Sequence, residues 1–190
     1  MSHPWRSEPG IALLAPVATV EEAASAAAAG AELVDAGDDA ALVPAIRRAV
    51  SGVRVCGEHE DADLVRDTAL ARRIGAALIC PGADAAEAAT RRGVAAERIL
   101  VQAAPAGIEA VVRAGWPVLA DLGGLADLGG GADPGGAAGL ARTEAAAAVC
   151  AWLGASVLRT RHVAEVRRCA DMTEAILGRR PPVWAVRGLA

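Results

Sequence analysis

The sequence predicts an α/β fold in which parallel strands alternate with helices, as in a (β/α) barrel or a doubly wound sheet. Short, uniformly apolar runs recur along the chain, and most of them begin about 20 residues apart. Such runs are typical of parallel strands that are buried on both faces. The spacing leaves room for one crossover helix between strands, as right-handed β-α-β units require. The seven runs are residues 11–17, 32–36, 53–56, 77–80, 99–103, 117–121 and 156–160. We therefore expect about seven strands.

Helix signals stand between these runs. Thr19, with a Glu three residues later, forms a capping box after the first run, and Gly30 marks the end of that helix. Residues 60–61, Glu and Asp, begin another predicted helix, which ends before Gly75. Asp84 begins the next one in the same way. Acidic residues at the start of a helix complement its dipole, so each signal supports a crossover helix.

One stretch interrupts this rhythm. Residues 123–140 hold eight glycines, and we expect a long connecting loop there. Such a loop before a helix can also cradle phosphate, but a P-loop is excluded because the chain contains no Lys. Thr143 is the expected cap of the alanine-rich helix that follows and ends at Gly154.

Composition excludes several classes of chemistry. The chain has no Lys, Asn, Phe or Tyr, so lysine Schiff bases, asparagine metal ligands and Phe or Tyr stacking platforms are impossible. A net charge of −4 and a pI near 5.4 argue against nucleic-acid binding. No apolar run reaches the length of a membrane span. Four widely spaced cysteines favour reduced thiols, and we expect a cytoplasmic protein.

The expected organisation is one domain. Residues 1–10 form a flexible N-terminus, residues 11–180 a single barrel domain, and residues 181–190 a C-terminal tail.

Polar residues at the ends of the predicted strands are the candidate site, because carboxyl ends of barrel strands line the active site. Cys56, Cys80 and the neighbouring His59 do not have the spacing of a metal motif, and we predict no metal site there. The catalytic residues stay unassigned. The possible pocket rim consists of Asp35, Asp38, Cys56, Cys80, Gln102 and Asp121.

Arg159 and Arg161 are the candidate anion site. They lie two residues apart at the end of the last run, so they share one face if the strand continues. Two guanidinium groups on one face can hold a phosphate bidentately. The alternative for Arg159 is an ion pair with Asp35 or Asp121.

Several segments resemble the dihydropteroate synthase family, whose members bind pterins. Residues 143–148 (TEAAAA), 153–159 (LGASVLR) and 163–166 (VAEV) are similar to its G-T-A-A-A helix, last strand and R-V-H-D-V-A-E motif. Residues 93–100 (GVAAERIL) and 115–119 (GWPVL) resemble its G-I-x-x-E-R-I-x and G-x-P-V-L segments. The resemblance implies a TIM-barrel fold and a reaction that joins a pterin pyrophosphate to para-aminobenzoate in folate synthesis, with Mg²⁺ on the pyrophosphate. Relative to that family, one strand and its helix are missing from this chain, so the resemblance implies an incomplete TIM-barrel-like (β/α) barrel of about seven strands.

The departures from the family pattern concern its binding residues. The family's pterin-binding Asp falls near Cys56, its Asn-Asp pair on Cys80 and the next residue, and the Asp of its D-P-G on Gln102. Of R-V-H-D only Arg159 is kept, and Arg161 stands at the His position. Buried polar groups left unpaired cost about 1–3 kcal/mol each, so these losses remove most pterin recognition.

These observations predict a dihydropteroate synthase-like pseudoenzyme that is related to folate biosynthesis and lacks the family's catalysis. Mg²⁺ would be its cofactor only if that activity were retained. One alternative is a small TIM-barrel enzyme that acts on a phosphorylated small molecule through the acidic rim and Arg159. Another is a non-catalytic partner or scaffold protein that binds a second copy or a full-length homologue and so covers the exposed sheet edges of an incomplete barrel. The expected ligand is small and phosphorylated or pterin-like.

Overall fold

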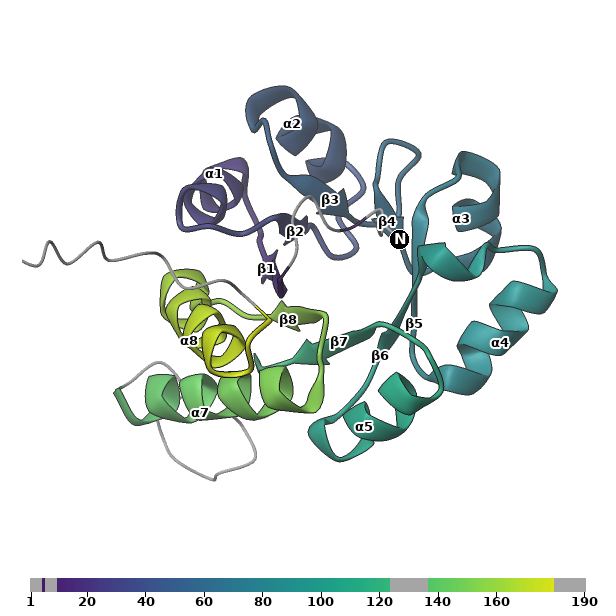
Figure 1. Ribbon diagram of the computed structural model, residues 1–190. Coiled ribbons are helices and arrows are strands. Elements are labelled where there is room, and N and C mark those ends of the chain that lie inside the picture. Colours follow the sequence, from purple (N-terminus) through teal and green to yellow (C-terminus); the bar gives the residue numbers. More distant parts are fainter. Residues whose placement is uncertain (1–4, 6–9, 124–136, 180–190) are drawn as a thin grey trace, which may run out of the picture.

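Eight parallel strands close into a barrel in the computed structural model, and helices surround it (Figure 1). The structure describes residue 5 and residues 10–123 and 137–179. Each strand pairs with the next, and β8 pairs with β1, which confirms the predicted (β/α) barrel. The strands are β1 (Ala12–Pro16), β2 (Leu33–Asp35), β3 (Arg54–Cys56), β4 (Leu64–Val65), β5 (Ala77–Cys80), β6 (Ile99–Gln102), β7 (Val118–Asp121) and β8 (Val157–Arg159).

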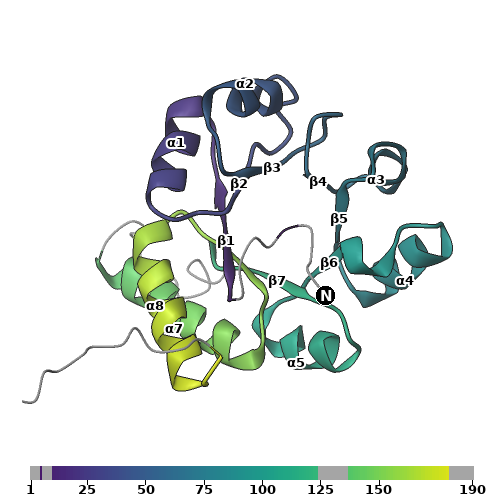
Figure 2. The ribbon, with the colours of Figure 1, turned by 45° about the horizontal axis from the view of Figure 1, so that its top comes forward.

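Helices cover the outside of the barrel, as Figure 2 shows. They are α1 (Val20–Ala28), α2 (Leu42–Ala49), α3 (Thr68–Ile74), α4 (Ala83–Arg91), α5 (Pro105–Arg113), α7 (Ala137–Leu153) and α8 (Val163–Ile176), with a short 3₁₀ turn, η1 (Ala96–Arg98), before β6. In the part of the chain that the structure describes, no helix is long and apolar enough to cross a membrane.

The predicted number of seven strands is wrong, because the two-residue strand β4 is also present. Leu64 pairs with Cys56 of β3 and with Ala77 of β5, so β4 fills the gap between them. Asp63, just before β4, holds the junction: its carboxylate accepts the backbone N–H of Val55 at 2.8 Å. Leu64 and Val65 stand between charged neighbours and are too few to form a recognisable apolar run, so the sequence does not predict this strand.

The missing element is a helix and not a strand. Residues 57–63, which connect β3 to β4, contain no helix. The helix expected to begin at residues 60–61 begins only at Thr68, where the Asp67 side chain accepts the N–H of Leu70 at 2.6 Å. Because the barrel is closed, it also has no open sheet edge. Exposed sheet edges therefore give no reason to expect association with a second copy or a homologue. Such association stays a prediction.

The predicted capping signals have mixed outcomes. Thr19 caps α1 as expected, since its side chain accepts the N–H of Glu22 at 3.1 Å. Thr143 does not cap α7; it lies inside that helix, and its hydroxyl donates to the carbonyl of Gly139 at 3.0 Å. Most of the predicted glycine-rich loop, residues 124–136, and the predicted tail, residues 181–190, lie outside the described residues.

Apolar side chains fill both the barrel interior and the layer between strands and helices. Leu14, Leu33, Leu64 and Leu100 are among the interior residues and are at most 1% exposed. Trp5 packs in the same interior cluster and is fully buried. It is the only described residue before Gly10, so the predicted flexible N-terminus lies otherwise outside the described residues.

Candidate functional site

The site is built around Asp35, the last residue of β2. Leu33 of the same strand points into the barrel, and strand alternation places the Asp35 side chain on that interior face, at the carboxyl end. The Asp35 side chain is only 1% exposed. Its Oδ1 accepts the N–H of Gly37 at 3.1 Å, and its Oδ2 accepts two guanidinium groups. A buried carboxylate is thus fully supplied with donors.

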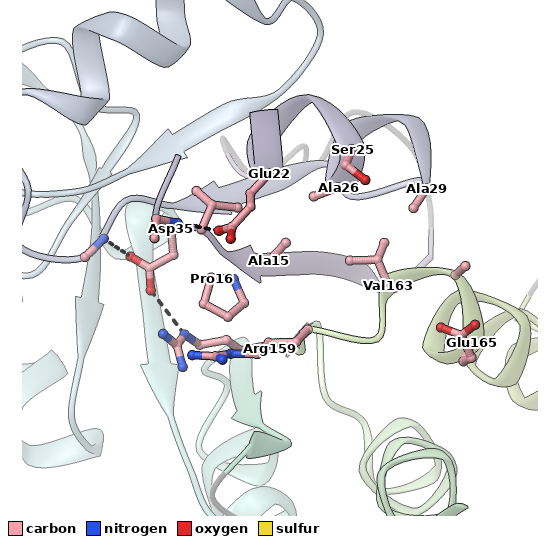
Figure 3. Close-up of a pocket in the computed structure, with 15 residues that line it drawn as sticks. Ala15, Pro16, Glu22, Ser25, Ala26, Ala29, Asp35, Arg159, Val163 and Glu165 are labelled. Carbon is pink, nitrogen blue, oxygen red and sulfur yellow. Dashed lines mark hydrogen bonds and ion pairs between the residues drawn. The ribbon is translucent and has the colours of Figure 1, made fainter. Parts of the chain in front are cut away.

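Arg159, the last residue of β8, is one of these donors. Its Nε lies 3.1 Å from Asp35 Oδ2 and its Nη1 lies 2.9 Å from Asp121 Oδ2 (the Asp35 contact is drawn in Figure 3). Asp121 stands directly opposite Arg159 in the register of β7 and β8. The alternative expectation for Arg159, an ion pair with Asp35 or Asp121, is therefore met by both carboxylates at once.

Arg66 is the other donor, and the sequence analysis did not single it out. Its Nη2 lies 2.7 Å from Asp35 Oδ2, although Arg66 follows β4 and Asp35 belongs to β2. Glu58, in the loop before β4, fixes the Arg66 backbone: its carboxylate accepts the N–H groups of Arg66 and Asp67 at 2.5 and 3.2 Å. Recognising β4 would have revealed Arg66, because it lies two residues beyond the interior residue Leu64.

The four side chains form a self-neutralised ion-pair network, here called the mouth network: Asp35, Arg66, Asp121 and Arg159. Burial alone would raise the pKa of Asp35, but the hydrogen bond and charge of Arg66, the Gly37 N–H and the charge of Arg159 together lower it below its ordinary value. Burial alone would lower the pKa of Arg66, whereas Cys56 and Asp35 raise it. Asp35 and Arg66 are therefore charged in the folded chain, and the network pairs two arginines with two aspartates.

The two candidate rim cysteines lie on opposite sides of the sheet. Cys56 points into the barrel beside Asp35 and is fully buried. Burial and the charge of Asp35 raise the pKa of Cys56 to about 12, so it is a neutral thiol. Cys80 was expected on the rim, but it is 3% exposed and packs between β5 and the helices, next to Leu78 and Ala86. Strand alternation turns Cys80 outward, because its neighbour Ile79 takes the interior position.

The remaining rim candidates stay apart from the mouth network. Gln102 ends β6 and is exposed, and Asp38 is exposed in the connection between β2 and α2. His59 does not meet the cysteines; its Nδ1 accepts the N–H of Asp61 at 3.0 Å. Within the described residues, no three His, Cys, Asp or Glu side chains are placed to hold a metal ion.

A cavity of about 590 Å³ opens beside the network, between α1 and α8 (Figure 3). Arg159 and Arg161 both line it, so the predicted pair does share one space. Arg161 is exposed and has no hydrogen bond or ion pair with any residue that the structure describes. The apolar wall includes Ala15, Ala26 and Val163. The cavity thus combines an apolar wall with one uncommitted positive charge.

Two carboxylates at the edge of this cavity are already engaged. Glu22 accepts the N–H of Ala18 at 2.7 Å, and Glu165 lies 3.7 Å from the guanidinium of Arg168. Their negative charges therefore oppose an anion less than free carboxylates would.

Comparison with known proteins gives relatives of one kind. No protein-family model matches the sequence. The chain is similar to inactive dihydropteroate synthase 2 of Mycobacterium tuberculosis (strain ATCC 25618 / H37Rv), with 32% identity over 191 residues. This alignment covers 88% of the chain but only 59% of that relative, so the chain spans less than two thirds of the relative's length. The protein of the same name from Mycobacterium leprae (strain TN) is 35% identical over 83 residues, which are 44% of this chain and 28% of that one.

Solved structures share the barrel. A structure of Mycobacterium tuberculosis Rv1207 matches with a TM-score of 0.69 and 24% identity, over 93% of this chain and 94% of that chain. The dihydropteroate synthase of Coxiella burnetii in complex with pteroic acid matches with a TM-score of 0.74 and 14% identity, over 90% of this chain and 94% of that one. At these identities the likeness establishes the fold.

Proposed function

Because the chain is a divergent member of the dihydropteroate synthase family, we propose that it keeps the family's barrel without catalysing dihydropteroate synthesis. The mouth network is the observation that carries this proposal. Arg159, the residue that matches the family's last-strand motif, is held by Asp35 and Asp121 at 3.1 and 2.9 Å. A substrate would have to break these contacts before it could use Arg159 or either carboxylate.

The physical reason is that both recognition and charge stabilisation are missing. A pterin edge is read by buried groups with free donors or acceptors, and Asp35 is already saturated by Gly37, Arg66 and Arg159. Departure of pyrophosphate needs positive charge that is directed at the leaving group. The two guanidinium groups of the mouth network are instead neutralised by carboxylates of the chain itself.

The Mg²⁺ ion that accompanies the family reaction does not fit the residues present here. Carboxylate and amide oxygens are its preferred ligands. The carboxyl end of β1 offers Pro16 and Val17 instead, and the nearby Glu22 carboxylate accepts the N–H of Ala18. The relatives in Mycobacterium tuberculosis and Mycobacterium leprae are themselves named inactive, which supports the same conclusion.

A turnover assay tests this proposal. The chain is incubated with 6-hydroxymethyl-7,8-dihydropterin pyrophosphate, 4-aminobenzoate and Mg²⁺, and an active dihydropteroate synthase serves as positive control. We expect no dihydropteroate above the rate without protein. Product formation that disappears in the Arg159→Ala variant would contradict the proposal.

We also propose that the cavity between α1 and α8 binds a small phosphorylated or pterin-like anion. Arg161 supports this, because its charge is uncommitted and it lines the cavity with Arg159. Calorimetry or NMR with inorganic phosphate and pyrophosphate tests the idea. Arg161→Ala should abolish binding, whereas Arg113→Ala, which removes an exposed charge on α5, should not. Equal binding by both variants would remove Arg161 from the site.

We further propose a cytoplasmic location, which the cysteines support. None of the four is paired, and Cys56, Cys80 and Cys150 are buried. Reduced buried thiols are typical of proteins in reducing compartments. Fractionation of cells that express the chain tests this, and recovery outside the cytoplasm would contradict it.

A further inference from the structure

Arg66 differs from the rest of the mouth network in how it is held. Its side chain is 40% exposed, whereas that of Asp35 is 1% exposed and those of Arg159 and Asp121 are 29% and 28% exposed. Arg66 therefore lies between solvent and the buried carboxylate. It reaches Asp35 from β4, across the intervening strand β3, which carries Cys56.

Among the described residues, one hydrogen bond holds the Arg66 guanidinium, from Nη2 to Asp35 Oδ2 at 2.7 Å. Glu58 accepts the Arg66 backbone N–H and acts on the guanidinium through its charge alone. Arg159 is held at both ends of its guanidinium, by Asp35 and Asp121. The Arg66 side chain can thus rotate outward with the loss of one ion pair and no change in the backbone.

Outward rotation of the Arg66 side chain would leave the Asp35 carboxylate able to accept a ligand. Asp35 would keep its position, because the Gly37 N–H and the Arg159 Nε both remain bound to it. It would then present one side of Oδ2 to solvent from a buried position next to Cys56 and Arg159. A planar group that donates from adjacent N–H atoms and carries a positive charge matches a buried carboxylate best.

We propose that Arg66 is an internal ligand, which occupies a binding site for a guanidinium or amidinium group and keeps that site closed. An external ligand of this class would compete with Arg66 for Asp35. Because Arg66 is part of the folded chain and is already oriented toward Asp35, its effective concentration there is far above that of a free ligand at millimolar concentration. The unaltered chain would therefore bind such ligands only weakly, and removal of the Arg66 side chain would open the site.

The test compares the thermal stability of the Arg66→Ala variant with and without methylguanidinium or acetamidinium chloride at millimolar, non-denaturing concentrations. At roughly five times the dissociation constant the melting temperature should rise by about 2–4 °C. Methylammonium chloride at the same concentration should not raise it, since it lacks the planar pair of donors. The unaltered chain should respond to none of the three ions.

Two controls separate the proposed site from general ion effects. Arg73→Ala also removes one exposed arginine, which pairs with Glu60 on the surface, and it should behave like the unaltered chain. Asp35→Asn combined with Arg66→Ala should lose the response, because the receptor carboxylate is gone. If Arg66→Ala does not fold, Arg66→Gln is tested in the same way. An equal response of the folded variant to all three ions, or no response to any, would overturn the proposal.

Discussion

Asp35 and Arg66 meet at the mouth of the barrel, with 2.7 Å between Oδ2 and Nη2, although 31 residues separate them in the sequence. The pair links β2 to the end of β4, and Arg159 extends the link to β8 and β7. Four strands are thus joined by side chains at the carboxyl end of the barrel, where TIM-barrel enzymes in general have their active sites. The arrangement suits a barrel that is stabilised at its mouth and not kept open there.

Replacement of Asp35 by Asn should destabilise the chain strongly. Two guanidinium groups, 40% and 29% exposed, would lose their shared carboxylate, and a hydrogen bond to a charged group contributes about 1.5–3 kcal/mol. Urea unfolding monitored by circular dichroism measures the change. Glu87→Gln is the matched control, because Glu87 pairs with Arg91 on the surface of α4 with 61% and 70% of the two side chains exposed. That control should change the free energy of unfolding by less than about 0.5 kcal/mol. Equal small effects of both variants would contradict the role given to Asp35.

The contribution of Asp35 should also depend on pH. Its pKa is lowered in the folded chain from an ordinary value of 3.8. A lowered pKa means that the stabilisation is fully present above that ordinary value and is lost as the pH falls through the folded value. The stability gap between the unaltered chain and Asp35→Asn should therefore be constant from pH 7 to about pH 5 and shrink in more acidic solution. A gap that shrinks already near neutral pH would point to another group.

The cysteines should differ in reactivity toward a thiol reagent such as Ellman's reagent. Burial and the charge of Asp35 raise the pKa of Cys56 to about 12, so its thiolate is scarce at pH 8. Cys80 and Cys150 are also buried, whereas Cys169 is half-buried. We expect one thiol, Cys169, to react readily in the folded chain and all four to react in urea. Rapid labelling of Cys56 in folded protein, located by mass spectrometry, would show that the mouth network is open.

Trp5 should be essential for stability although it precedes the first strand. It is fully buried among the interior side chains, and loss of a buried Trp side chain costs about 3–5 kcal/mol. Trp152 provides the control, because it is 59% exposed on α7. Urea unfolding should show a large loss for Trp5→Ala and a change within about 0.5 kcal/mol for Trp152→Ala. Similar values for the two variants would mean that the segment around Trp5 is not part of the folded core.

The spacing of the apolar runs and the helix-capping residues between them were sufficient to predict most of the barrel. Seven strands are long enough, and apolar enough, to show as runs between capping signals. Strand β4 does not show as a run, because Leu64 and Val65 stand between Asp63 and Arg66. These two residues form a strand because they pair with β3 and β5 in the closed sheet, not because of a local preference. The sequence therefore suggested an incomplete barrel where the structure has a closed one.

The same error limited the prediction of the site. Asp35, Asp121 and Arg159 follow recognisable strands, and their meeting could be expected because carboxyl ends of barrel strands converge. Arg66 could not be placed without β4. The prediction placed Cys80 on the rim, although its side chain points away from the barrel interior. In a uniformly apolar strand such as β5, the sequence does not show which residues point inward and which point outward.

Titration of 6-hydroxymethyl-7,8-dihydropterin pyrophosphate with Mg²⁺ into the unaltered chain, followed by calorimetry, tests the central claim most directly. The claim is that the mouth network occupies the place where a pterin substrate would bind. We expect no saturable heat that depends on Asp35: any binding of the pyrophosphate group in the cavity between α1 and α8 should be lost in Arg161→Ala and kept in Asp35→Asn. Saturable binding with a micromolar dissociation constant, weakened by Asp35→Asn, would show that the barrel mouth accepts the substrate and would contradict the account.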